Sequence, residues 1–107
     1  MPATAQPQTV TGKTPAEVLN YLADFSAEIA ANEPGDSITA INSVVCKGTP
    51  ATLAVASSGI NQAGTGVMIR LTSGSPGVTY SVVVNISLAS SQTMERTFMV
   101  PVVAVRG

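Results

Sequence analysis

Apolar and polar residues alternate over most of the chain that follows residue 36. The longest alternation, 78–89, places six apolar side chains on one face: Val78, Tyr80, Val82, Val84, Ile86 and Leu88. A period of two residues is typical of a β-strand with one buried face. The same pattern predicts four further strands, at 37–46, 52–57, 66–72 and 93–105.

These patterns also predict which residues of each strand face the core. Within 66–72 the buried positions are Val67, Ile69 and Leu71, and within 37–46 they include Ile38 and Ala40. Within 93–105 the expected inward positions are Met94, Arg96, Phe98, Val100 and Val102. Pro101 interrupts that last strand, and proline in a sheet indicates an edge or a bulge.

Turn-forming residues separate the strands. Pro34 fixes φ and Gly35 tolerates positive φ, so 33–36 is predicted to be a turn. The other turn or loop segments are 47–50, 58–65, 73–77 and 90–92. Strands at intervals of roughly 8–15 residues, with turns between them, are typical of a two-sheet sandwich. The chain is therefore predicted to be all-β, an antiparallel β-sandwich.

The segment 14–33 fits two kinds of secondary structure. Thr14 to Glu17 has the form of a helix capping box, and apolar residues follow at helical spacing: Val18, Leu22, Phe25 and Ile29. A strand is indicated instead by the alternating apolar residues Leu19, Tyr21, Ala23 and Phe25, which Leu22 interrupts. The residues alone leave this choice open.

Residues 1–13 differ from the rest of the chain. They hold two prolines and a single aliphatic residue, Val10, which is too little to anchor a core element. We expect an extended N-terminal arm over 1–13, followed by a sandwich domain over 14–107. Two interpretations of the arm stay open, a disordered terminus and a tether that becomes ordered against a neighbour.

Composition and charge exclude several classes of function. The chain has 107 residues, enough for one domain, and carries only 10% charged residues with a net charge of −1. Its five basic residues are scattered, so nucleic acid is not expected as a partner. No apolar run approaches the length of a membrane helix, and the N-terminus lacks the features of a secretory signal, so we expect synthesis in the cytoplasm and no membrane partner. Little charge repulsion opposes association, which favours permanent partners and a homo-oligomer.

Residues that could carry catalysis are scarce. The chain has no histidine, so its eleven Ser and twelve Thr lack the commonest activating base. Cys46, the one cysteine, is expected to be a small buried hydrophobe. The carboxylates match no calcium-loop spacing. We therefore predict no enzyme activity, no catalytic residue, no metal and no cofactor. Tyr80, just after the turn at 73–77, is similar to the tyrosine corner of immunoglobulin-like sandwiches and is predicted to stabilise the fold.

Four stretches of the chain together resemble a known family. They are Lys13-x-Pro15-x-Glu17-Val18-Leu19-x-Tyr21-x-x-Asp24-Phe25-Ser26, Gly35-Asp36-Ser37-Ile38, Leu71-Thr72-Ser73-Gly74-x-x-Gly77-x-Thr79-Tyr80 and Glu95-Arg96-Thr97-Phe98-x-Val100-x-Val102. The resemblance is to small virion proteins of tailed bacteriophages, described as fiber–tail adaptors or as head-decoration proteins. In that pattern a Trp stands at the position of Phe25, and this chain has no Trp.

The resemblance implies an immunoglobulin-like antiparallel β-sandwich held in multiple copies on the virion. It implies an adaptor that joins tail or fiber components, with capsid decoration as the alternative. It favours a strand over about 18–27 after a turn at 14–17. It also implies docking through the arm, for which we predict Thr9, Val10 and Lys13. A receptor- or glycan-binding module is less favoured, because the four aromatic residues occupy expected core positions.

Overall fold

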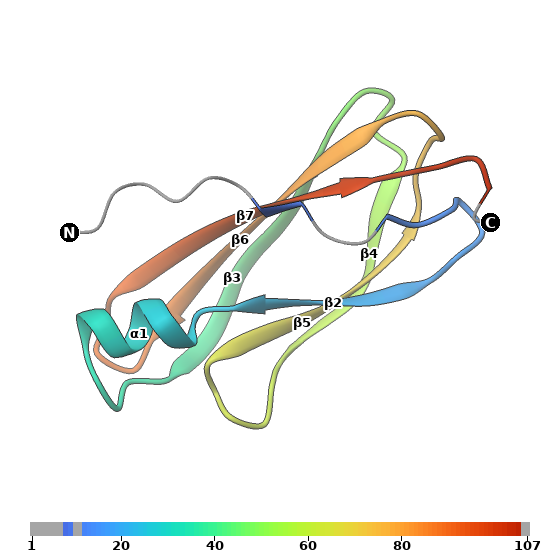
Figure 1. Ribbon diagram of the computed structural model, residues 1–107. Helices are drawn as coiled ribbons and strands as arrows, with labels where there is room; N and C mark the ends of the chain where they lie inside the picture. The colour runs from blue at the N-terminus through green and yellow to red at the C-terminus, as the bar shows by residue number, and fades with distance from the viewer. Residues whose placement is uncertain (1–7, 10–11, 106–107) are drawn as a thin grey trace.

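The computed structural model describes residues 8–9 and 12–105, which form seven strands and one short helix (Figure 1). In chain order the elements are β1 (Gln8–Thr9), β2 (Leu19–Asp24), α1 (Ser26–Asn32), β3 (Ile38–Lys47), β4 (Leu53–Ile60), β5 (Gly66–Ser73), β6 (Thr79–Leu88) and β7 (Thr93–Pro101).

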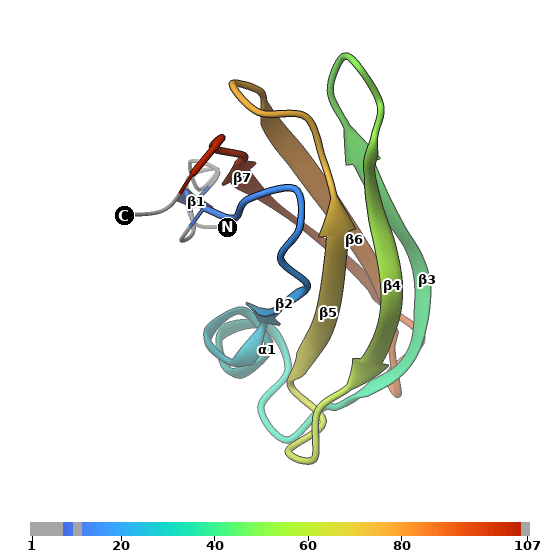
Figure 2. The same ribbon diagram turned by 90° about the vertical axis from the view of Figure 1, so that its right-hand side faces the viewer.

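These strands form two sheets that pack face to face, as Figure 2 shows. One sheet has the order β1-β7-β6-β3 and the other the order β2-β5-β4. Neighbouring strands run antiparallel, apart from β1, which pairs with β7 in parallel. The prediction of a mostly β, two-sheet sandwich is confirmed.

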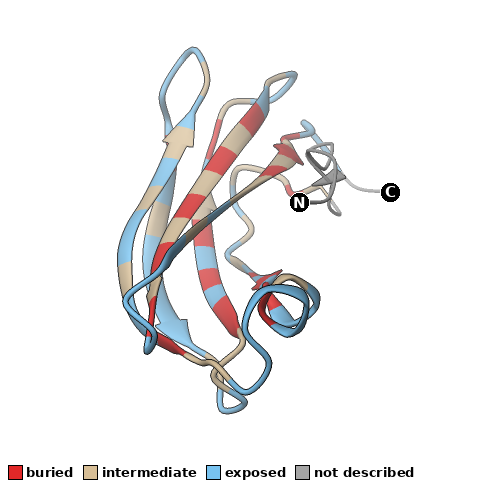
Figure 3. Cartoon of the chain, turned by 90° about the vertical axis from the view of Figure 1, so that its left-hand side faces the viewer, coloured by how far each residue is buried: buried red, intermediate tan, exposed pale blue. Residues whose placement is uncertain are grey.

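The core lies between the sheets; the alternating residues of β5 and β6 form its centre, and residues of β2, α1, β3, β4 and β7 complete it (Figure 3). Val67, Ile69 and Leu71 are fully buried, as their alternation predicted. The inward residues of β6 are also buried, from Tyr80 to Leu88. Burying one such aliphatic side chain stabilises the fold by about 1.5–3 kcal/mol.

Strand β3 corrects part of the predicted pattern. Ile38 is buried, but Ala40 is exposed and does not share its face. The register with β6 shifts between Ile38 and Ala40, and again between Ile41 and Ser43. Each extra residue in a bulge reverses the alternation that follows it, so Ile41 turns partly inward in place of Ala40.

Strand β4 is longer than its sequence pattern predicted. We expected it to end at residue 57 with a loop over 58–65, yet it pairs with β5 as far as Ile60. The loop that follows is closed by Asn61, whose Oδ1 accepts hydrogen bonds from the backbone N–H groups of Thr65 and Gly66, both at 3.1 Å. Pairing with β5, in which buried and exposed residues alternate regularly, keeps the Ser- and Gly-rich end of β4 extended.

The segment 14–33 contains a turn, a strand and a helix in succession. The turn is present, since Glu17 N–H donates to the Thr14 carbonyl at 3.1 Å. The expected strand over 18–27 is confirmed for 19–24 and wrong for its last three residues, because β2 ends at Asp24 and α1 begins at Ser26. Both periodicities are therefore real but cover different residues. Tyr21 and Ala23 alternate inward along β2, while Phe25 and Ile29 lie one helical turn apart, and all four are buried.

Tyr80 has the structural role that its position predicted. Its side chain is fully buried, and its hydroxyl donates to the Pro50 carbonyl at 2.6 Å. The same oxygen accepts a hydrogen bond from the Ser75 backbone N–H at 3.0 Å and lies 2.9 Å from Thr52 Oγ1. One hydroxyl thereby joins the β3–β4 and β5–β6 connections.

Candidate docking surfaces

The base of the N-terminal arm is held by Lys13. Its side chain is 0% exposed, and the Nζ ammonium donates to the backbone carbonyls of Ser73 at 2.5 Å and Thr14 at 2.6 Å. Its backbone lies along the chain beyond β7, with Lys13 N–H donating to Pro101 and Val103 N–H donating to Lys13. Lys13, predicted as a docking residue, thus lies inside the domain.

The buried ammonium of Lys13 lies near the carboxylate of Glu17. Burial lowers the pKa of Lys13, and the nearby Glu17 carboxylate raises it. Glu17 also accepts a hydrogen bond from the Thr14 backbone N–H at 2.7 Å. This is half of the capping box seen in the sequence, formed here in a turn that no helix follows.

The other two predicted docking residues lie nearer the N-terminus. Thr9 belongs to β1, in which Gln8 pairs with Phe98 and Thr9 with Met99. Val10 lies outside the described residues. The structure therefore places Thr9 and Lys13 along one edge of the four-stranded sheet. Sequence reasoning did not identify β7 as their neighbour, although Pro101 had indicated an edge strand.

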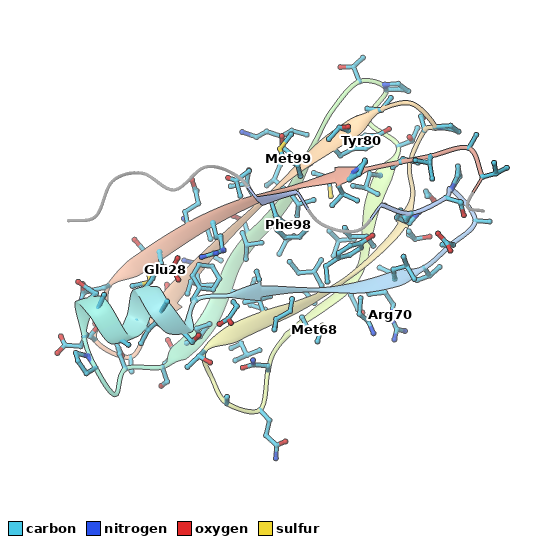
Figure 4. The ribbon with its side chains drawn as sticks, in the orientation of Figure 1. Glu28, Met68, Arg70, Tyr80, Phe98 and Met99 are labelled. Atoms are coloured by element: carbon cyan, nitrogen blue, oxygen red, sulfur yellow. The ribbon has the colours of Figure 1, made fainter. Side chains whose placement is uncertain are left out.

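The charged side chains near α1 bind other parts of the domain. Glu28 of α1, labelled in Figure 4, forms an ion pair with Arg96 of β7, which ties the helix to the end of the sandwich. The Ser26 backbone N–H donates to Asp24 and lowers the pKa of that carboxyl. Asp36 accepts from the Ser90 hydroxyl at 2.5 Å and so joins the α1–β3 turn to the β6–β7 turn. These contacts give Glu28, Asp24 and Asp36 structural roles within the domain.

The described residues bring together no candidate metal-binding group. Within 8–9 and 12–105, no group of three or more His, Cys, Asp or Glu could hold a metal ion. Cys46 is half-buried, and burial raises the pKa of its thiol, which makes it a poor nucleophile at neutral pH. In the same part of the chain, no helix is long and apolar enough to cross a membrane.

All four aromatic side chains belong to the core. Tyr21, Phe25, Tyr80 and Phe98 are each at most 7% exposed, and the rings of Tyr21 and Phe98 stack with their centroids 6.1 Å apart. Sugar-binding sandwiches usually need exposed rings for stacking. The aromatic residues therefore give no support to a glycan-binding site.

The outer faces of the two sheets differ in chemistry. The β3-β6-β7 face carries a hydrogen-bonded group in which Asn42 donates to Asn85 at 2.8 Å and accepts from Ser87 at 3.0 Å. The β2-β5-β4 face exposes Leu22 and Met68. The sequence analysis did not select either residue for binding. Leu22 could have been noticed, because it is the apolar residue that interrupts the alternation of β2.

Comparison with known protein families gives a match over most of the chain. The family model described as podophage GP4 fiber-tail adaptor protein gp77 matches residues 13–101. No curated protein matches the chain. The match begins at the buried Lys13 and ends at Pro101, the last residue of β7, so it covers most of the sandwich. The chain therefore belongs to the podophage fiber-tail adaptor family and is a structural component of the virion, without an enzymatic role.

Proposed function

We propose that residues 1–13 are the arm through which this adaptor docks on one of its virion partners. Thr9 and Val10 would supply contacts, and Lys13 would hold the base of the arm in place. The domain over 14–107 then acts as the body that presents the arm. Capsid decoration is the weaker alternative, because the matching family is described as a fiber–tail adaptor.

The observation that carries this proposal is the anchoring of Lys13. Its ammonium is bound to Ser73 and its backbone to Pro101 and Val103, so the point at which the arm leaves the domain is rigid. Ahead of it, β1 pairs with β7 over only two residues. A short strand at a sheet edge is suited to backbone pairing with a partner, since strand addition uses the same unpaired N–H and C=O groups.

Deletion of residues 2–11 tests the docking role, because it removes the arm and keeps Lys13. We expect the shortened adaptor to fold with an unchanged circular dichroism spectrum and to be lost from purified phage particles. A matched control replaces residues 2–11 with a Gly/Ser segment of equal length. Recovery of the shortened protein on particles in normal amounts would refute the docking role of the arm.

We also propose that the adaptor acts in several copies, as a homo-oligomer or symmetric ring. A net charge of −1 and 10% charged residues leave little repulsion between copies. Quantitative mass spectrometry of particles against the major capsid protein gives the copy number. About a dozen copies or fewer, up to a few tens, fits a tail adaptor, whereas hundreds would fit head decoration.

We further propose that the sandwich is immunoglobulin-like. The orders β2-β5-β4 and β3-β6-β7 correspond to the B-E-D and C-F-G strands of that fold. Tyr80 stands near the start of the strand equivalent to F, and its hydroxyl bonds to upstream backbone at Ser75, as in a tyrosine corner. An experimental structure with a different strand order would contradict this assignment.

A further inference from the structure

An apolar pair lies in the middle of the outer face of the β2-β5-β4 sheet. Leu22 of β2 and Met68 of β5 are direct cross-strand partners and are 47% and 41% exposed. Figure 4 shows Met68 and Arg70 on the same outer side of this sheet. On β4 the neighbour of Met68 is Gly59, which has no side chain. On the β4 side, no side chain therefore borders Met68 within its row.

Opposite charges flank this pair at equal spacing. The row on one side holds Asn20 and Arg70, and the row on the other side holds Asp24 and Gly66. Arg70 donates from Nε to Asn20 at 3.0 Å, and no carboxylate of the described residues lies within ion-pair distance of it. Asp24 is exposed, and its low pKa keeps it ionised at neutral pH. Arg96 also lowers the pKa of Asp24 but forms its ion pair with Glu28, so Arg70 and Asp24 can each accept a partner of opposite charge.

This arrangement is complementary to itself. A twofold axis that crosses the strands along the Leu22–Met68 row would bring a second copy face to face, with its strands running the opposite way. The row that contains Arg70 of one copy then meets the row that contains Asp24 of the other. Such a contact buries both apolar pairs and forms two equivalent ion pairs.

We infer that the outer face of the β2-β5-β4 sheet, centred on Leu22 and Met68, is a twofold contact between two copies of this chain. The inference rests on the proposed multi-copy assembly and adds a surface through which copies meet in pairs; a ring of such pairs needs a second, head-to-tail contact. It does not involve the arm. The apolar centre is small, so the contact is weak in free solution and becomes effective when copies are concentrated on a particle.

The first test compares two matched variants by sedimentation velocity over a concentration series of the full-length protein. Leu22→Ser removes one half of the apolar pair and is expected to weaken dimerisation about tenfold. Val45→Ser is the control, because Val45 is similarly exposed, at 44%, on the other sheet. We expect it to dimerise like the wild type. A wild type that stays monomeric up to a concentration of about 1 mM, or equal effects of the two variants, would overturn the inference.

A charge cycle tests the predicted ion pairs. Arg70→Glu places a carboxylate next to Asp24 of the second copy and should weaken the dimer several-fold. Asp24→Asn in the same chain should restore part of this loss, since it removes the repulsion and keeps an oxygen for the Ser26 N–H. Within one chain the two residues are about 13 Å apart along the strands, too far for strong coupling in salt. Purely additive effects would therefore contradict the contact.

The experiments distinguish a failure of the twofold contact from a failure of docking through the arm. The protein without residues 2–11 should still dimerise, because its β2-β5-β4 face is intact. If it dimerises and is lost from particles, both the face contact and the arm stand. If dimerisation is absent while arm deletion still prevents incorporation, only the twofold contact is wrong.

Discussion

The ammonium of Lys13 donates a hydrogen bond to the backbone carbonyl of Ser73, a residue 60 positions further along the chain. Ser73 ends β5 with a positive φ of 65°, and Gly74 follows with a φ of 99°. The left-handed turn directs the Ser73 carbonyl to Lys13, where a second carbonyl, of Thr14, also binds the ammonium. This contact joins the base of the arm to the strand that forms the centre of the second sheet.

Replacing Lys13 with Met should destabilise the domain. Met has a similar length but cannot donate, so the Ser73 carbonyl loses the ammonium, while the Thr14 carbonyl keeps only the Glu17 N–H. We expect a loss of about 1–3 kcal/mol in the free energy of unfolding, measured by urea denaturation. Lys47→Met, at an exposed lysine of β3, serves as the control and should change stability by less than about 0.5 kcal/mol. Equal stability of the two variants would show that the ammonium contributes nothing.

The Tyr80 hydroxyl is expected to stabilise the fold independently of its ring. Tyr80→Phe keeps the buried ring and removes the bonds to Pro50, Ser75 and Thr52. We expect a decrease of about 1–3 kcal/mol in the free energy of unfolding, visible as a lower Tm. Unfolding within about 0.5 kcal/mol of the wild type would contradict a tyrosine-corner role.

Gly48 is expected to tolerate no side chain, because it lies against Tyr80. A Cβ placed at residue 48 would lie 2.5 Å from a carbon of the Tyr80 ring. Gly48→Ala should therefore cost about 1–3 kcal/mol, since the buried ring has to move. Gly59→Ala is the matched control, with no atom within 4 Å of the added Cβ and a strand conformation that any residue adopts. Thermal unfolding of both variants checks the difference, and similar Tm values would show that the ring moves freely.

Protonation of Asp36 should account for part of the loss of folding stability at low pH. The Ser90 hydroxyl and the backbone N–H groups of Ser37 and Ser90 bind its carboxylate and hold its pKa below the usual value of 3.8. A carboxyl with a lowered folded-state pKa stabilises the fold above its unfolded pKa, and this contribution is lost as the pH falls through the folded pKa. The stability difference between the wild type and Asp36→Asn should therefore shrink below about pH 4.

Urea unfolding between pH 7 and pH 2.5 measures that difference. Ser90→Ala removes the strongest donor to Asp36 and should reduce the same pH dependence without changing the carboxyl itself. A constant difference between the wild type and Asp36→Asn over this range would mean that Asp36 titrates alike in the folded and unfolded chain.

The alternation of apolar residues was sufficient to predict the central strands and their buried faces. In β5 and β6 each inward position is buried, because a strand with one face on the core has only one register that hides its apolar residues. The turns at 33–36 and 73–77 were predictable for a similar local reason, since Gly35, Gly74 and Gly77 adopt positive φ there.

The remaining features depended on contacts between distant residues. Ala40 is exposed because pairing with β6 introduces a bulge, and the segment around Phe25 becomes helical where β2 reaches the end of the sandwich. Lys13 is buried because Ser73 and Thr14 present carbonyls to it, which no local pattern reveals for a residue that usually stays exposed. The sequence by itself thus determined the central strands β5 and β6, their buried faces and the turns at 33–36 and 73–77. Only the tertiary structure decided which polar groups are buried and which apolar residues stay exposed. The burial of a side chain depends on which residues of other strands pack against it or bind it, and these are distant in the sequence.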